Sequence, residues 1–414
     1  MTISPGDTSW VLVSTGLVLL MIPALGFFEA GLLRSKNSLS TLMQTFSGLI
    51  ILSILWFIIG FTLVYAPSPW GIIGGLKWIF FNGVPTDTSL DYAPNIPGTT
   101  FATYQMMFAV ITPLLITGAF AERLKWDAFF VFIIAWSIFI YYPLAHWVWG
   151  KGWLAQLGVY DFAGGIVIHT SAGMGSLAAA LVLGRRKNFG PDIMVPHNIP
   201  LAIIGAAMLW FGWFGFNAGS ALTAGPLASN ALLTSQIASA TAGMVWLVLS
   251  WKKSKKPSVT GVITGAIAGL AGVTPAAGYI SPQSAFFLGI ILGFASYYGI
   301  LLFKQKLRID DALDVSSVHG LTGIIGALAI GLAATTIINP SGPNGLLYGN
   351  PSQLGIQALG VLVAAVQGFG GTILIMKVIN TVIGLRVKED EEELGLDATQ
   401  HGEREYGDEW GASA

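Results

Sequence analysis

The amino-acid sequence predicts an all-α polytopic membrane protein with eleven transmembrane helices. Hydrophobic residues make up 54% of its 414 residues and charged residues only 10%, whereas a soluble domain carries about 25% charged residues. Apolar stretches long enough to cross a bilayer, which takes about 20 residues, recur along the whole chain. In addition, Lys and Arg gather in every second loop, as expected when alternate loops are cytoplasmic.

The apolar stretches define the predicted spans in order along the chain. They cover approximately residues 9–33, 40–65, 100–121, 127–148, 162–184, 198–219, 229–251, 258–279, 283–303, 315–338 and 353–384. Residues 66–99 are polar and rich in Pro and Gly, so this segment is predicted to be a loop without a span of its own.

The basic residues test this count independently. They occupy the loops after the odd-numbered spans: Arg34 and Lys36; Arg123 and Lys125; Arg185, Arg186 and Lys187; Lys252, Lys253, Lys255 and Lys256; Lys304, Lys306 and Arg308. The intervening loops hold only Lys77 and Lys151. The alternation predicts a multi-pass protein of the cell membrane (plasma or inner), with the N-terminus outside and the C-terminus in the cytoplasm.

Eleven spans fit two five-helix halves and one extra helix. If spans 1–5 (about 9–184) repeat as spans 6–10 (about 198–338), the halves have opposite orientations, an architecture that places a site near the bilayer midplane. We therefore expect residues 1–384 to form a transmembrane channel domain, and residues 385–414 a cytoplasmic tail. The charged composition of the tail suits a solvated segment or a docked regulatory one.

Two histidines lie within predicted spans: His169 in GGIVIHTSAGMG and His319 in VSSVHGLTG. An ionisable residue at membrane depth is costly and indicates a functional site. The two occupy equivalent places in the two halves, and the surrounding small residues allow close helix packing. They either join two helices structurally or line a lumen that handles a proton or a solute bearing N–H groups, because a neutral imidazole offers one donor and one acceptor.

An aspartate precedes each histidine, Asp161 before the first and Asp314 before the second. A carboxylate there can cap the N-terminus of the following helix or coordinate a cation. We prefer the cap for Asp161 and expect Asp314 to play the mirrored role.

Several aromatic residues carry a possible role beyond packing: Phe108, Trp149, Trp213 and Phe216, with Ser220 nearby in GWFGFNAGS. An indole face beside a hydroxyl group would attract a cation by about 0.5–2 kcal/mol, but from the residues alone we prefer packing at the membrane interface for each of them.

Other functions find no support in the sequence. The net charge of −1 does not indicate the excess of basic residues that is typical of nucleic-acid-binding proteins. There is no cysteine, and no metal-ligand spacing, catalytic triad or phosphate-binding motif is apparent. We expect neither an enzyme nor a bound metal or cofactor.

The motifs DFAGGIVIH, GWFGFNAGS, VHG at 318–320 and GLRVKEDEEELGLDATQHGE together resemble the ammonium transporter family, in its Amt branch. The resemblance runs from the first span to the tail. It implies eleven spans, N-out and C-in, in a homotrimer with one pore per subunit, and a substrate that is ammonium or ammonia, with methylammonium as an analogue.

The resemblance also assigns residues to the pore. It implies that Phe108, Trp149 and Ser220 form an outer ammonium recruitment site, and that Phe108 and Phe216 form a phenyl gate beneath it. His169 and His319 match the twin-histidine pair.

The remaining matches are supporting positions. Trp213 and Thr274 match positions that line or flank the pore, and Asp161 matches an aspartate with a structural and electrostatic role. The tail resembles a segment that couples the three subunits and meets a P-II type signalling protein.

One position departs from the family pattern. The first span contains Phe27-Phe28-Glu29-Ala30-Gly31, where the family commonly has Tyr or a small residue. We expect Glu29 to pair with Arg34 or Lys36. The alternative is a role in proton or ion handling at the inner vestibule.

A mechanism follows from the resemblance and from electrostatics. Moving a small cation into low dielectric costs of order 20 kcal/mol in the ideal case, and several kcal/mol remain after relaxation. We therefore expect ammonium to lose its proton near the gate and to pass as ammonia, with net electrogenic proton movement. The rival interpretations are an ammonium sensor with low flux and a passive channel for neutral solutes.

Overall fold

The computed structural model describes residues 2–68, 70–187, 189–190 and 195–405. These residues form helices and loops, and pairing between extended segments is limited to two isolated β-bridges. Within the described chain, ten helical segments are long and apolar enough to cross a membrane, and one apolar helix is shorter. The all-helical membrane architecture predicted from the sequence is therefore confirmed.

Several segments are built from consecutive helices. The first five are α1 (Pro5–Leu32); α2 (Ser38–Leu55) with η2 (Trp56–Gly60) and α3 (Phe61–Tyr65); α4 (Gly98–Leu114) with α5 (Thr117–Phe120); α6 (Trp126–Trp136) with η4 (Ser137–Tyr141) and α7 (Tyr142–Val148); and η5 (Gly165–Thr170) with α9 (Ser171–Leu183). The following six are α10 (Ile199–Gly219); α11 (Pro226–Ser254); α12 (Val259–Val273); α13 (Pro282–Ile300) with η6 (Leu301–Lys306); η7 (Ser316–Leu321) with α14 (Thr322–Ala333); and α15 (Ser352–Val382).

Six short helices precede, follow or connect the helices given above. They are η1 (Ser35–Asn37), η3 (Ile79–Phe81), α8 (Trp153–Gln156), η8 (Leu346–Tyr348), α16 (Glu389–Leu394) and η9 (Asp397–His401).

The largest difference from the predicted spans concerns residues 258–279. Helix α12 ends at Val273, and residues 274–279 form turns. Pro275 lies two residues beyond the end of the helix, and proline cannot continue the backbone hydrogen bonding of a helix. Hydropathy extends across the turns because they are buried, which is why the sequence predicted a longer span.

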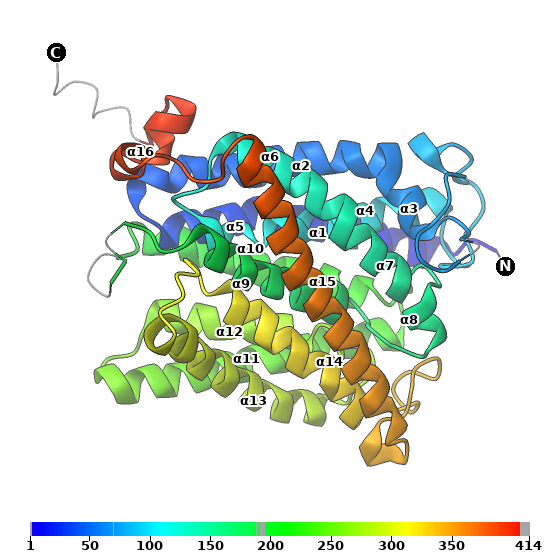
Figure 1. Ribbon diagram of the computed structural model, residues 1–414. Helices are drawn as coiled ribbons and strands as arrows, with labels where there is room; N and C mark the ends of the chain where they lie inside the picture. Colours follow the sequence, from blue (N-terminus) through cyan, green and yellow to red (C-terminus); the bar gives the residue numbers. More distant parts are fainter. Residues whose placement is uncertain (1, 69, 188, 191–194, 406–414) are drawn as a thin grey trace.

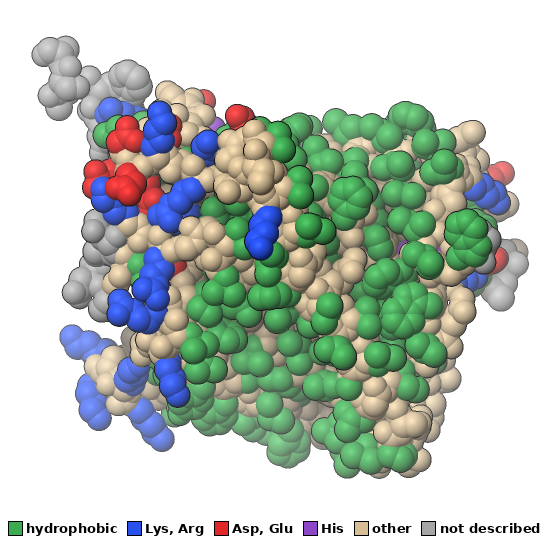
Figure 2. Space-filling model, viewed as in Figure 1, with side chains coloured by type: hydrophobic (Ala, Val, Ile, Leu, Met, Phe, Trp, Pro, Cys, Tyr) green, Lys and Arg blue, Asp and Glu red, His purple; other side chains and the backbone are tan. Residues whose placement is uncertain are grey.

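The apolar segments lie side by side between two ends of the molecule (Figure 1). One end, here the tail end, carries α16 and the loops 33–37, 121–125 and 307–315. The opposite end carries the loop 66–97 and α8. Figure 2 shows Lys, Arg, Asp and Glu gathered at the tail end, whereas hydrophobic side chains cover the body of the molecule.

Small residues set the helix packing. A Cβ at Gly205 in α10 would lie 2.3 Å from the backbone nitrogen of Phe28 in α1, and one at Gly368 in α15 would lie 2.4 Å from the Ser171 oxygen in α9. Such positions let backbones approach closely, as is common between membrane helices. The segment of η5 and α9 packs in the same way against η7 and α14.

Buried ion pairs join the loops at the tail end. Glu122 pairs with Arg34 and with Arg186, each at 2.8 Å, and Arg186 pairs with Asp310 at 2.7 Å. Burial opposes ionisation of Glu122, but the Arg186 and Arg34 guanidiniums outweigh it and lower the pKa of that carboxyl to about 2.

The described part of the tail packs against this end. The Asp397 carboxylate accepts hydrogen bonds from the backbone N–H groups of Leu39 (3.1 Å) and Ser40 (2.7 Å) at the start of α2. The Leu396 N–H donates to Asn37 at 2.9 Å. Of the two possibilities for the tail, docked or solvated, the structure shows a docked segment up to residue 405, and residues 406–414 lie outside the described residues.

Candidate functional site

The two predicted histidines meet in the middle of the molecule. Their Nδ1 atoms lie 3.1 Å apart, and the two rings are nearly parallel, with centroids 5.2 Å apart. His169 is in η5 and His319 in η7, so each comes from the π-helical start of its segment. Both side chains are buried.

This geometry fixes the chemistry of the pair. Two neutral imidazoles at hydrogen-bond distance share one hydrogen, so one Nδ1 donates and the other accepts. The two Nε2 atoms then differ: one is an acceptor and the other carries a hydrogen. His169 Nε2 is buried and has no hydrogen-bond partner in the described chain, which leaves one polar atom free for a small solute.

A narrow apolar cavity adjoins the pair. Its volume is about 20 Å³, and the two histidines line it together with ten apolar side chains: Met21, Leu25, Phe28, Ile111, Leu115, Ile168, Leu209, Trp213, Phe216 and Ile267. The Trp213 ring stacks on His169 at 5.6 Å. Trp213 Nε1 donates to Thr274 Oγ1 at 2.9 Å, so Thr274 fixes the indole but is not itself among the residues that line the cavity.

Two phenyl rings close this cavity toward the opposite end. Phe108 in α4 and Phe216 in α10 have centroids 4.4 Å apart at an angle of 32°. Phe216 lines the narrow cavity, whereas Phe108 lines a second cavity of about 240 Å³ beyond it. The stacked rings separate the two spaces.

The second cavity contains the residues predicted for the outer site. Trp149 stands edge-on to Phe108 at 6.4 Å, and both line the cavity with Ser220. The Ser220 hydroxyl donates to the Phe216 carbonyl at 2.8 Å and lies 3.2 Å from the Tyr104 hydroxyl. An aromatic wall with hydroxyl oxygens nearby is a suitable environment for a small cation.

Sequence reasoning missed other side chains of this cavity. Tyr65, Tyr92, Phe101 and Gln105 also line it. Tyr92 comes from the long loop 66–97, and its hydroxyl donates to the Tyr65 carbonyl at 2.8 Å. No local pattern marks these residues, because only the fold brings the loop over α4.

Asp161 lies beside this cavity but faces away from it into the start of η5. Its carboxylate accepts four backbone hydrogen bonds, from Gly164, Gly165, Ile166 and Val167, at 2.8–3.0 Å. Burial raises the pKa of Asp161, and the four N–H groups oppose that effect. Its backbone carbonyl accepts the indole N–H of Trp149 at 2.9 Å, so one residue fixes both the helix start and the tryptophan.

Asp314 does not mirror Asp161. Its carboxylate pairs with Lys304 at 2.8 Å, and burial raises the pKa of Asp314 to about 6 although Lys304 opposes this. The carboxylate that binds the start of η7 belongs to Asp311, which accepts from the N–H (2.7 Å) and hydroxyl (2.6 Å) of Ser316. The expected capping role is therefore corrected from Asp314 to Asp311, because Asp314 turns toward the cation on η6.

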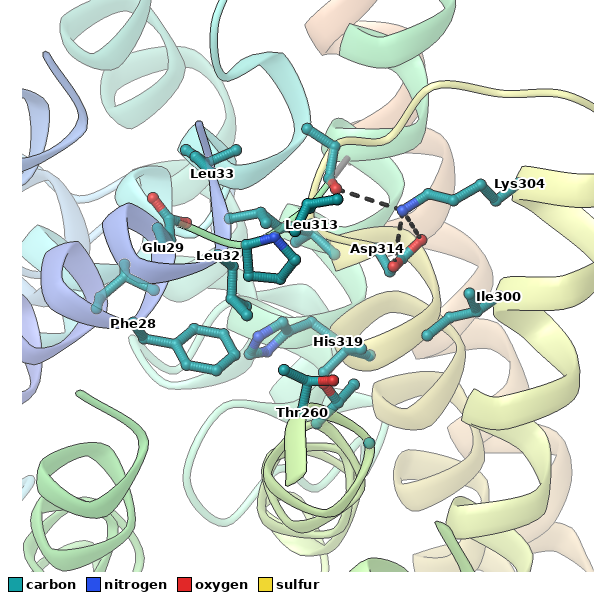
Figure 3. Close-up of a pocket in the computed structure, with 18 of the residues that line it drawn as sticks. Phe28, Glu29, Leu32, Leu33, Thr260, Ile300, Lys304, Leu313, Asp314 and His319 are labelled. Atoms are coloured by element: carbon teal, nitrogen blue, oxygen red, sulfur yellow. Dashed lines mark hydrogen bonds and ion pairs between the residues drawn. The ribbon is translucent and has the colours of Figure 1, made fainter. Parts of the chain in front are cut away.

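A third cavity of about 310 Å³ lies at the tail end, and His319 lines it together with Phe28 and Leu115, which also line the narrow cavity. Figure 3 shows Glu29, Asp314 and His319 around this space. The three cavities thus follow one another from the opposite end, past the phenyl rings and the histidines, to the tail end.

The pairing expected for Glu29 is wrong. Arg34 binds Glu122 instead, and the Lys36 ammonium donates to the backbone carbonyls of Glu392 and Glu393. The Glu29 carboxylate accepts from the Thr117 hydroxyl at 2.8 Å. Both basic side chains are engaged by segments distant in sequence, which proximity along the chain could not reveal. Within the described residues, no group of three metal-ligating side chains occurs.

Comparisons with known proteins give a consistent result. A family model described as the Ammonium Transporter Family matches residues 9–406. The chain is 56% identical over 406 residues to ammonium transporter 1 of Dictyostelium discoideum, which covers 97% of this chain and 87% of that protein. It is 44% identical over 403 residues to the ammonium transporter of Bacillus subtilis, covering 97% and 99%.

Solved structures show the same similarity. The crystal structure of Candida albicans Mep2 superimposes with a TM-score of 0.89 at 32% identity, covering 94% of this chain and 88% of that one. A structure described as a sensor Amt protein gives a TM-score of 0.88 at 32% identity, covering 96% and 98%.

Proposed function

Because the chain belongs to the Ammonium Transporter Family, we propose that it transports ammonium across a membrane through the three consecutive cavities. The observation that carries this proposal is the histidine pair. Its Nδ1 atoms lie 3.1 Å apart, and His169 Nε2 is buried without a partner in the described chain. A small solute with N–H groups and a lone pair satisfies both kinds of Nε2 atom.

Recruitment takes place in the cavity of the opposite end. Phe108 and Trp149 supply aromatic rings, and Ser220 supplies a hydroxyl oxygen. Cation–π attraction contributes about 0.5–2 kcal/mol. This is less than the several kcal/mol that a cation loses on entering an apolar cavity, even after relaxation, so the site concentrates ammonium without carrying it through.

Ammonium gives up one proton at the Phe108–Phe216 gate and passes the histidines as neutral ammonia. The proton follows separately through the imidazole pair, and ammonia takes up a proton again at the tail end. One positive charge therefore crosses for each ammonium ion, and transport is electrogenic. Potassium has no proton to release and is rejected at the gate.

We also propose the larger architecture. The segments cross the cell membrane eleven times, with the N-terminus outside and the tail end in the cytoplasm, which agrees with the basic residues gathered there. The two halves form an inverted repeat, supported by the equivalent π-helical starts η5 and η7. Residues 1–384 form the channel domain.

The assembly and its regulation complete the proposal. Three copies form a homotrimer with one pore in each subunit, and methylammonium is accepted as an analogue. Residues 385–414 form a regulatory tail, supported by the docked α16 and η9, that a P-II type signalling protein can contact. The proposed transport requires no bound cofactor.

A second candidate function is ammonium sensing with low flux. It is favoured by the similarity to the structure described as a sensor Amt protein and by the docked tail. Flux separates the two functions, because a sensor would bind ammonium with little accompanying current.

The test is electrical recording on the purified protein in liposomes. Replacing both His169 and His319 with Leu is expected to abolish the ammonium-driven current while His197→Gln, outside the path, leaves it intact. Unchanged current and unchanged potassium exclusion in the double variant would contradict the proposal. Water or urea flux without an ammonium-dependent current would instead indicate a passive channel for neutral solutes.

A further inference from the structure

The membrane helix α11 ends in a run of lysines at the tail end of the molecule. Lys252, Lys253, Lys255 and Lys256, called here the α11 lysines, occupy its last turn and the turn that follows. All four side chains are exposed. Figure 2 shows Lys and Arg side chains gathered around the end of α11, whereas the Asp and Glu side chains of this face lie mostly over the docked tail. This corner of the tail end is therefore strongly basic.

The α11 lysines have no partner within the described residues. None of the ion pairs and side-chain hydrogen bonds found there involves their ammonium groups. Other basic side chains at the tail end are paired with carboxylates: Arg34 with Glu122, Arg186 with Asp310, Lys187 with Glu393, Lys304 with Asp314 and Arg386 with Glu392. Orientation in a membrane requires a basic loop, but it does not require that the charges of the loop stay unpaired. Because like charges repel one another, this cluster favours an anionic partner outside the chain.

The length of α11 places these ammonium groups at the level of lipid headgroups. The helix has 29 residues, which span about 44 Å at about 1.5 Å per residue. A bilayer with its headgroup regions is about 40–45 Å thick. Trp251, directly before the lysines, is exposed, and an exposed indole at the end of a membrane helix is typical of the bilayer interface.

One exposed side of α11 leads from the hydrocarbon region to these charges. Met244, Val248 and Trp251 are exposed, and steps of four and three residues place them on the same side of the helix. Lys252 continues this side, one turn after Val248. An apolar surface that ends in an indole and an ammonium group is complementary to a phospholipid, which has apolar chains and a charged phosphate.

The turn after the helix keeps the last two lysines close to its end. Lys255 adopts a left-handed backbone conformation with φ of 60°, which ends the helix. The Ser254 hydroxyl lies 2.8 Å from the Ser250 carbonyl oxygen and 2.6 Å from the Lys256 carbonyl oxygen. These contacts hold Lys256 beside the last turn, so the four charges stay together.

We propose that the α11 lysines bind the headgroup of an anionic phospholipid, whose acyl chains lie along Met244 and Val248. The ammonium groups donate charge-assisted hydrogen bonds to phosphate oxygens, and the charge of the lipid offsets their mutual repulsion. Basic clusters beside a membrane helix attract anionic lipids in this way, by about fivefold for each Lys or Arg near the surface. The inference concerns the lipid-facing surface and goes beyond the proposed transport of ammonium.

Photocrosslinking in a bilayer tests this site in the wild-type protein. The purified protein is reconstituted into liposomes of equal parts phosphatidylcholine and phosphatidylglycerol, with a trace of either lipid carrying a diazirine in one acyl chain. Mass spectrometry then measures adducts on residues 244–251 of α11. As an internal control, it measures adducts around Leu362 and Val366, which are exposed on α15. We expect the ratio of phosphatidylglycerol to phosphatidylcholine adducts to be about fivefold higher on α11 than on α15.

Two variants separate charge from the bulk of the side chains. K252Q/K253Q/K255Q/K256Q removes the four charges, and its adduct ratio on α11 is expected to fall to that of α15. K252R/K253R/K255R/K256R keeps the charges and is expected to retain the wild-type ratio. Concentrated sodium chloride should lower the ratio in the wild-type protein, because exposed charges are screened, and this measurement needs no substitution.

The adduct ratios decide the outcome. Equal ratios on α11 and α15 in the wild-type protein would overturn the inference, and would show that a soluble partner or the acidic tail of a second copy covers the lysines instead. A preference for phosphatidylglycerol that persists in the Gln variant would also overturn it, because the lysines would not be its source. The ammonium current is measured separately, so the failure of the transport proposal and the failure of this inference are distinguishable.

Discussion

Gly173 of α9 and Gly320 of η7 touch through their backbones. A Cβ on Gly173 would lie 2.1 Å from the Gly320 Cα, which no side chain could tolerate without movement of one segment. His319 directly precedes Gly320, so this crossing sets the distance between the two imidazoles. The contact is a restraint on the histidine pair that a single substitution can test.

Gly173→Ala is expected to push the two segments apart. Inserting a methyl group into packed backbone costs about 1–3 kcal/mol or more, and the shift lengthens the 3.1 Å contact between the imidazoles. We expect a lower thermal unfolding temperature and a reduced ammonium current in liposomes. Gly370→Ala on α15, where a Cβ would meet nothing within 4 Å, is the control. Equal behaviour of the two variants would contradict the prediction.

Asp161→Asn is expected to loosen the start of η5 and the outer site together. The amide group replaces one carboxylate oxygen that accepts two backbone N–H groups, and each donor left unsatisfied costs about 1–3 kcal/mol. Titration with a denaturing detergent should show a lower free energy of unfolding for the variant. Because the Trp149 indole is bound to the Asp161 carbonyl, the ammonium concentration for half-maximal current from the opposite end should also rise. A variant with wild-type stability would show that the cap is unimportant.

Glu122→Gln is expected to destabilise the tail end at neutral pH. Removing one partner of a buried ion pair costs about 3–5 kcal/mol. Asp91→Asn serves as the control, because its pair with Lys151 at 3.8 Å is exposed and such pairs contribute about 0–1 kcal/mol. The free energy of unfolding of the purified protein measures both changes.

The Glu122 carboxyl also makes the free energy of unfolding depend on pH. Its pKa of about 2 in the folded protein lies below the ordinary value of 4.5, so the folded state binds its proton less tightly than the unfolded state. The stabilisation is therefore complete above pH 4.5 and is lost as the pH falls toward 2, by about 3 kcal/mol. Glu122→Gln should lack this part of the acid sensitivity. Identical acid profiles of variant and wild type would exclude Glu122 as its source.

Asp397→Ala is expected to release the tail from α2. The carboxylate acts as a helix cap supplied from the other end of the chain, and losing a cap costs about 1 kcal/mol. Hydrogen exchange of the Leu39 and Ser40 amides should therefore quicken about fivefold, if exchange proceeds through local release. Asp390→Ala, at an exposed position of α16, should leave these amides unchanged.

Hydropathy predicted most of the helical segments, because membrane spans obey local rules. The length of an apolar stretch and the place of basic loops both depend on neighbouring residues only. The meeting of His169 with His319 agrees with the equivalent places that the two residues hold in the proposed halves. The end of α12 was misjudged because buried turns are as apolar as a helix.

The predictions that failed concern partners from distant segments. Arg34 was expected to pair with Glu29, but it binds Glu122 instead. Glu122 lies 88 residues further along the chain, and both of its carboxylate oxygens accept from Arg34 Nε. Asp311 rather than Asp314 binds the start of η7, since the loop turns Asp314 toward Lys304. Which of two nearby carboxylates faces a helix depends on loop conformation, and composition does not encode it.

The small volume of the space beside the histidines has a consequence for kinetics. About 20 Å³ accommodates about one water-sized molecule, so occupants cannot pass one another. Solute molecules that enter from the two ends must then compete for one binding place. The flux of an isotopically labelled solute in one direction should therefore fall when unlabelled solute is added on the far side.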